Sequence, residues 1–148
     1  MSRVVAIDPG RSKCGLILAN VRQDVVLSGL VLEADAVLDA LHDWAEDQPL
    51  AQILIGDGTG CSSHQAALRQ LATVRVIPER GTTLRARQRY WDLWPPHGWR
   101  KLLPDGLRLP PDQLDAVAAL VMLEDAMERR LHWPGPKPNF DVRTWPAP

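Results

Sequence analysis

Three short apolar runs in the chain each lead to a carboxylate. VVAI precedes Asp8, ILIG precedes Asp57, and VRVI precedes Pro78 and Glu79. Short apolar runs bounded by turn residues are typical of buried strands. Strands that pair in parallel bring their carboxyl ends to one edge, and in open α/β sheets that edge is where sites form. The pattern therefore favours an α/β fold with acidic residues gathered at one sheet edge.

The order of the remaining elements predicts a mixed sheet. Three strands come first and are joined by short Gly- or Asn-containing links that suit antiparallel hairpins; they cover residues 3–8, 14–20 and 25–32. From residue 51 onward strands alternate with helices, which indicates parallel pairing with right-handed crossovers. The later strands are expected at 52–56 and 74–77, and the helices at 35–48, 62–71, 83–94 and 112–131. The predicted fold class is thus α/β, a five-stranded mixed sheet with three antiparallel strands followed by two parallel ones, flanked by helices.

Two segments lack the periodicity of strands or helices. Residues 95–111 are rich in Pro and Gly and are expected to be irregular. The last sixteen residues contain five prolines, which predicts an extended C-terminal arm. We therefore divide the chain into a domain at 1–132 and an arm at 133–148.

Overall charge does not point to any class of partner. The net charge is −1 and the pI about 6.4. The amino terminus lacks a long apolar stretch, and the longest later one, 116–123, is far short of the ~20 residues that span a bilayer. Two cysteines form no disulfide framework. These features predict a cytoplasmic protein without a membrane partner.

The acidic residues form the candidate metal site. Asp57 and Glu79 are expected at one sheet edge, and Asp8 joins them if its strand lies beside residues 52–56. Asp112 and Asp115, three residues apart at the start of the last helix, share one helical face. Each acid alone also suits a turn or a helix start, and it is their joint arrangement that favours a site.

Crowded carboxylates repel one another unless cations neutralise them. Oxygen ligands favour Mg²⁺ or Mn²⁺ over zinc, and two such ions about 4 Å apart can activate water at a phosphodiester. The expected chemistry is therefore phosphodiester hydrolysis with two bound Mg²⁺ or Mn²⁺ ions.

Three stretches resemble one known superfamily. AIDPGRSKCGLILAN resembles the opening motif of the RuvC and YqgF branch of the RNase H-like superfamily, in which Asp-Pro-Gly follows the first strand and a Gly lies in the second. VIPERGTTLRA is similar to the Asp-Glu-Arg-x-Thr-Thr segment of YqgF proteins, with Pro78 where that family has Asp. DQLDAVAALVML resembles the last-helix motif, and the spacing of Asp112 and Asp115 is similar to the paired acids of RuvC.

The resemblance implies an RNase H-like fold and metal-dependent cleavage of structured nucleic acid. RuvC proteins resolve four-way DNA junctions as dimers, and YqgF proteins are linked to maturation of pre-16S ribosomal RNA. Glu79 matches the YqgF pattern, whereas Asp57 matches RuvC. The residues expected to hold metal and to be catalytic are Asp8, Asp57, Glu79, Asp112 and Asp115.

We therefore predict an endonuclease similar to Holliday junction resolvases, with a homodimer as one possible state. One alternative is a YqgF-like nuclease acting on structured precursor RNA, and another is an inactive nucleic-acid-binding module with the same fold. An actin-like sugar kinase is disfavoured, because those folds duplicate the domain and need far more than 148 residues.

The expected nucleic-acid surface follows the third acid. Between residues 75 and 108 there are eight basic residues and three acidic ones. Side chains expected to contact nucleic acid are Arg80, Thr82, Thr83, Arg85, Arg87, Arg89, Arg100 and Lys101. Tyr90, Trp91, Trp94 and Trp99 lie among these residues, and they either stack on exposed bases or pack into the core.

Overall fold

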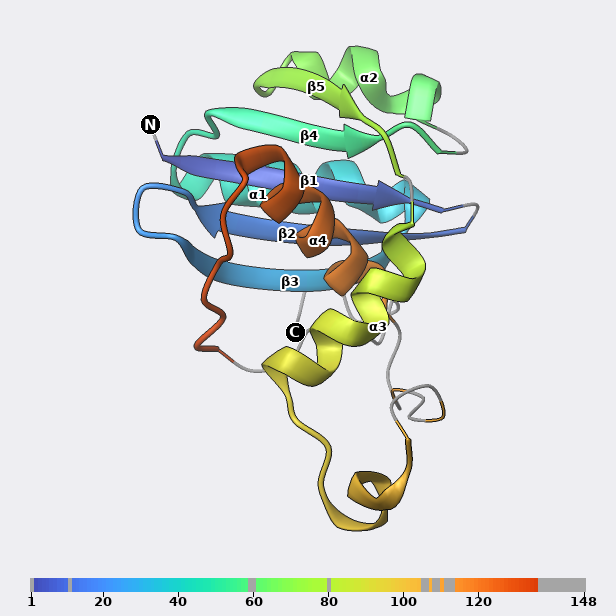
Figure 1. Ribbon diagram of the computed structural model, residues 1–148. Helices are drawn as coiled ribbons and strands as arrows, with labels where there is room; N and C mark the ends of the chain where they lie inside the picture. Colours follow the sequence, from blue (N-terminus) through green and yellow to red (C-terminus); the bar gives the residue numbers. More distant parts are fainter. Residues whose placement is uncertain are drawn as a thin grey trace.

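Five strands form one mixed sheet at the centre of the molecule (Figure 1). The structure is a computed structural model that describes residues 2–10, 12–58, 61–79, 81–104, 107, 110 and 114–135, with the backbone alone at 61–64. The strands are β1 (Arg3–Pro9), β2 (Lys13–Asn20), β3 (Val25–Glu33), β4 (Gln52–Gly56) and β5 (Thr73–Ile77). Their order across the sheet is β3-β2-β1-β4-β5.

Strand pairing confirms the predicted mixed topology. β1 and β3 are each antiparallel to β2, whereas β1, β4 and β5 run parallel to one another. The carboxyl ends of these three parallel strands therefore lie at the same edge of the sheet. Asp8, Asp57 and Glu79 each lie at or just beyond one of these ends.

Helices cover both faces of the sheet (Figure 1). They are α1 (Val37–Asp47), α2 (Cys61–Arg69), α3 (Thr82–Leu93) and α4 (Asp115–Met127), with 3₁₀ turns η1 (Ala34–Ala36) and η2 (Gly98–Leu102). One core joins α1 to the sheet, and the other joins α4 to the opposite face. β1 serves both cores by alternation: Val5 and Ile7 face α1, while Val4 and Ala6 face α4.

The last helix is shorter than the sequence predicts. The helix is expected to run to Leu131, but α4 ends at Met127, because Glu128 adopts a left-handed backbone with φ of 54°. The start of the predicted helix, with Asp112, lies outside the described residues. The helix expected at 35–48 is also divided, since η1 precedes α1.

The segment after α4 returns to the sheet. Val26 N–H donates to the His132 carbonyl at 2.7 Å, and His132 N–H donates to the Asp24 carbonyl at 2.8 Å. Trp133 is only 8% exposed and belongs to the α4-side core. The body thus extends at least one residue beyond the predicted boundary at 132, whereas residues 136–148 of the predicted arm lie outside the described part. No helix in the described ranges is long and apolar enough to cross a membrane.

Candidate active site

Three of the predicted acids lie on the same side of the sheet. Asp8 follows Val4 and Ala6 at two-residue steps, and both of these residues pack on the α4 side. Glu79 stands two residues after Ile77, which belongs to the same α4-side core. Asp115 is the first residue of α4 itself. The three acids therefore belong to the same layer, between the sheet edge and α4.

Gly15 allows α4 to approach the sheet at this point. Gly15 is the cross-strand partner of Asp8, and a Cβ at this position would overlap the backbone carbonyl of Asp115. A glycine inside a strand commonly marks such a close approach of another backbone. The contact brings Asp115 beside Asp8.

Glu79 is held over the end of the neighbouring strand. A Cβ at either Gly56 or Gly58 would overlap the Glu79 carboxylate. The Asp57 carboxylate accepts a hydrogen bond from the Glu79 backbone N–H at 3.2 Å, and Asp57 N–H donates to the Ile77 carbonyl at 3.0 Å. Gly81, at φ of 65°, then turns the chain into α3. Asp57 is exposed and positions Glu79 through its backbone.

The closeness of these acids perturbs the ionisation of Asp8. Burial raises the pKa of Asp8 from 3.8 to about 8, assisted by hydrogen bonding to Glu79 and by the negative charges of Glu79 and Asp115. Glu79 Oε1 is buried and has no hydrogen-bond partner among the described residues. The site therefore combines excess negative charge with an acceptor that no described protein donor satisfies.

This donor set suits a hard divalent cation. All three side chains offer carboxylate oxygens, which Mg²⁺ and Mn²⁺ prefer. Burial raises the pKa of the nearby Cys14 thiol, so this residue remains protonated at neutral pH. Within the described ranges, no three His, Cys, Asp or Glu side chains are already arranged as a metal site. Binding would thus have to draw the carboxylates closer together.

The predicted acids consequently divide into three groups. Asp8, Glu79 and Asp115 come together, and Asp57 lies beside them with its carboxylate on the Glu79 backbone. Asp112 lies outside the described residues, as does Arg80 from the predicted nucleic-acid surface.

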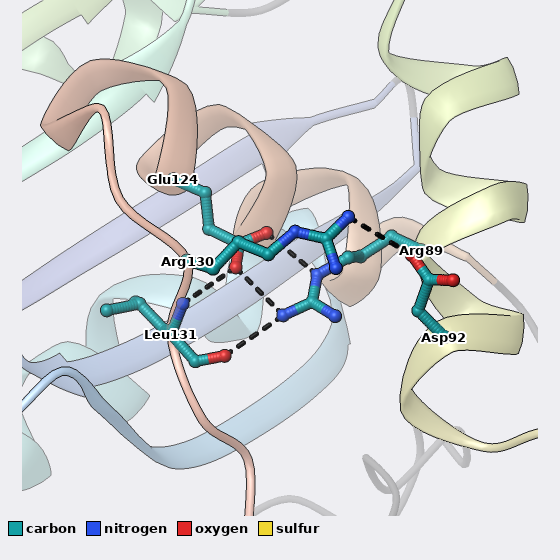
Figure 2. Close-up of polar contacts among 5 residues, drawn as sticks. All are labelled: Arg89, Asp92, Glu124, Arg130 and Leu131. Carbon is teal, nitrogen blue, oxygen red and sulfur yellow. Dashed lines mark hydrogen bonds and ion pairs between the residues drawn. The ribbon is translucent and has the colours of Figure 1, made fainter.

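Arg89 has an internal role instead of the expected phosphate contact. Its side chain is buried, and Nε and Nη2 donate to the two Glu124 carboxylate oxygens, each at 2.9 Å (Figure 2). Nη2 also donates to the Leu131 carbonyl at 2.9 Å, and Leu131 N–H donates to Glu124 at 2.8 Å. We call Arg89, Glu124 and Leu131 the α3–α4 lock.

The other predicted nucleic-acid residues differ in exposure. Thr82 is buried, with its hydroxyl donating to the Glu79 carbonyl at 3.4 Å, whereas Thr83 is exposed. Arg85 is half-exposed and paired with Asp125 on α4. Arg87 is half-buried; Arg100 and Lys101 lie on η2.

The aromatic residues separate just as clearly. Tyr90 makes edge-to-face contacts with Trp91 and Trp94, and Trp94 makes another with Trp133. Trp99 instead is 64% exposed, and the Arg100 guanidinium lies 5.1 Å from the centre of its ring. Tyr90 is therefore buried, Trp91 and Trp94 are partly buried against the core, and Trp99 is exposed.

Sequence reasoning did not assign a supporting role to the residues that surround the site. Gly15 and Gly56 could have been found, because an isolated glycine inside an apolar strand often marks a close backbone approach. Glu124 could also have been found, since it follows eight residues of an all-apolar helical run and so required a buried partner. No local signal indicated that Leu131 would complete the lock.

Comparison with solved structures shows the fold. The chain resembles the RuvC protein of T. thermophilus in a complex with a Holliday junction substrate, with a TM-score of 0.51 and 13% sequence identity. The match covers 84% of this chain and 96% of the RuvC chain. Together with the strand order, this likeness shows an RNase H-like fold. No protein-family model matches the chain, and no curated protein matches it by sequence.

Proposed function

We propose that this protein is a divalent-metal-dependent endonuclease that hydrolyses phosphodiesters in structured nucleic acid. One observation carries the proposal: Asp8, Glu79 and Asp115, from three distant segments, meet at one partly buried sheet edge where the pKa of Asp8 reaches about 8. A protein gains no stability from crowding like charges in this way. Such a cluster is typical of functional sites, where perturbed pKa values concentrate.

The chain's own groups have distinct roles in this proposal. Asp8, Glu79 and Asp115 would hold Mg²⁺ or Mn²⁺, with two ions as the expected number. Bound there, such ions supply a water of lowered pKa and neutralise charge on the phosphodiester oxygens. Asp57 positions Glu79 through the backbone hydrogen bond, and Gly15 allows the Asp115 backbone to lie close against β2. The proton on Asp8 has to leave before that side chain can act as a ligand.

A four-way DNA junction is the proposed substrate. The RuvC chain of similar fold is itself bound to a Holliday junction substrate, and paired cuts across a junction would require a homodimer of this chain. Precursor RNA is the second candidate, because Glu79 lies in the segment that resembles YqgF proteins and belongs to the site.

The test is a side-by-side cleavage assay. End-labelled four-way junction DNA and a structured precursor RNA are each incubated with the protein and Mg²⁺ or Mn²⁺. We expect cleavage of the junction, and a rate at least about 100-fold lower for Asp8→Asn, because a group that holds the metal is lost. Asp39→Asn is the matched control: it makes the same chemical change at an exposed position of α1 and should retain full activity.

Each outcome identifies one candidate. Cleavage of the RNA alone would replace the junction proposal with RNA processing. Tight binding without cleavage of either substrate would indicate an inactive binding module. Equal rates for Asp8→Asn and Asp39→Asn would exclude this carboxylate edge as the active site.

A further inference from the structure

The segment that follows α3, residues 95–104, projects from the body of the protein. It carries η2 and, in Figure 1, extends beyond the end of α3, away from the sheet. We call residues 95–104 the η2 loop.

Large apolar side chains on this loop are unusually exposed. Trp99 is 64% exposed and Leu102 is 86% exposed; Leu107, just beyond the loop, is 64% exposed. Single exposed apolar residues are ordinary, but several in one short segment mark an interaction surface. Trp91 and Trp94, only a few residues earlier in the chain, instead pack against Tyr90. Trp99 thus differs from its neighbouring tryptophans in facing solvent.

The charge of the loop selects the kind of partner. Both charged residues of the loop, Arg100 and Lys101, are cationic, and no Asp or Glu occurs in residues 95–104. The Arg100 guanidinium lies 5.1 Å from the Trp99 ring centre, so a cation and a π face are presented together. A ligand with a flat base beside a phosphate matches this pair, because bases stack on aromatic rings while cations hold the backbone.

We infer that the η2 loop binds an unpaired nucleotide, with the base stacked on Trp99 and the neighbouring phosphate held by the cations of η2. The inference rests on the proposed function in one respect, namely that the ligand is nucleic acid. It adds a second contact, separate from the carboxylate edge.

α3 lies between the two contacts. It begins three residues after Glu79 and has 12 residues, which at 1.5 Å per residue corresponds to about 18 Å, and the η2 loop extends beyond its far end. The unpaired nucleotide is therefore expected several positions from the phosphodiester at the carboxylate edge.

The test measures binding without cleavage. The full-length protein in EDTA is titrated into two fluorescently labelled DNA probes: a blunt 20-base-pair duplex, and the same duplex with a five-nucleotide single-stranded overhang. We expect Trp99→Ala to raise the Kd for the overhang probe about 5- to 150-fold, which corresponds to the loss of one stacked base. Binding of the blunt duplex should change less than twofold.

Two further variants make the result specific. Trp99→Phe retains a ring and should restore most of the affinity for the overhang probe. Leu27→Ala removes another exposed apolar side chain, on β3, and should bind both probes as the wild type does. An unchanged Kd for Trp99→Ala, an equal loss on both probes, or no rescue by Trp99→Phe would overturn the inference.

This experiment is independent of the nuclease proposal. If the wild type cleaves no substrate but Trp99→Ala still loses overhang binding, the inference stands and the nuclease proposal fails. If the wild type cleaves junctions and Trp99→Ala binds normally, only the inference fails.

Discussion

Two clusters of ionisable side chains on the α4 side of the sheet differ in how their charges are balanced. In the α3–α4 lock, Arg89 and Glu124 carry opposite charges, and the Leu131 backbone adds one further hydrogen bond to each of them. At the carboxylate edge, Asp8, Glu79 and Asp115 are all acids whose ionised forms would repel one another, and Glu79 Oε1 has no partner in the described part of the chain.

The difference indicates that the lock stabilises the fold, whereas the carboxylate edge does not. A fully satisfied buried ion pair fixes one arrangement of the helices, and removal of either partner leaves an uncompensated charge. A cluster of like charges does the reverse, because removal of one charge relieves repulsion. Neutralising substitutions should therefore destabilise the lock and leave the carboxylate edge as stable as before, or more so.

Loss of the lock should give the largest effect on stability. Glu124→Ala leaves the buried Arg89 guanidinium and the Leu131 N–H without their acceptor, so we expect a loss of about 3 to 5 kcal/mol in the free energy of unfolding. Urea denaturation followed by circular dichroism measures this change.

The control lies one residue further along α4. Asp125 pairs with Arg85 at the surface, where both side chains are about half exposed, so Asp125→Ala should cost at most about 1 kcal/mol. Similar losses for the two variants would contradict the distinction between buried and surface pairs. Glu124→Gln, which retains one carbonyl acceptor, should fall between them.

A smaller loss is expected where α4 meets β2. Gly15→Ala forces the Asp115 backbone away from the sheet, which should cost about 1 to 3 kcal/mol, as overpacking does. Because Asp115 moves away from Asp8, the rise in Tm produced by Mn²⁺ should also shrink. A thermal melt with and without Mn²⁺ reports both effects, and Gly135→Ala, where a Cβ meets nothing within 4 Å, is the control. If Mn²⁺ raises the Tm of Gly15→Ala as much as that of the wild type, metal binding does not depend on the close approach of α4 to β2.

The smallest effect concerns pH. The pKa of Asp8 is about 8 in the folded protein and near 3.8 when unfolded, so the folded state retains a proton that the unfolded state releases. The stability from this group is present below about pH 4 and is lost as pH rises through 8. In EDTA, we expect the wild type to lose about 1 to 2 kcal/mol more than Asp8→Asn between pH 5 and 8, after allowance for screening by water.

Urea denaturation at pH 5, 6.5 and 8 measures this difference, and titrations elsewhere cancel in the comparison with the variant. Asp39→Asn should follow the wild-type curve. Parallel curves for wild type and Asp8→Asn would mean that Asp8 ionises normally.

Sequence alone predicted the sheet and the location of the acids well, for a physical reason. Burial on both faces makes β1 and β4 continuous apolar runs, and parallel pairing then fixes where Asp8 and Glu79 lie. Helix ends were less predictable. Leu131 was expected in the last helix, but Glu128 ends α4, and the Leu131 backbone instead takes part in the lock.

Charged side chains on α3 were the least predictable part. Arg85, Arg87 and Arg89 are equivalent in sequence, but the position of α4 decides that Arg89 is buried and that Arg85 pairs at the surface. Such pairing depends on contacts 35 to 40 residues apart, which no local pattern reports. The same applies to Trp133, whose burial depends on the return of the chain to β3.

The hydrogen bond from Glu79 N–H to the Asp57 carboxylate closes a ring that contains α2 and β5. This hydrogen bond joins the residues that follow β4 and β5, so the distance between the ends of these two strands does not depend on the length of the crossover that connects them. The α2 segment can therefore accept inserted residues at a modest entropic cost while the carboxylate edge keeps its dimensions. This makes the crossover the natural place to lengthen the protein or to attach a reporter group.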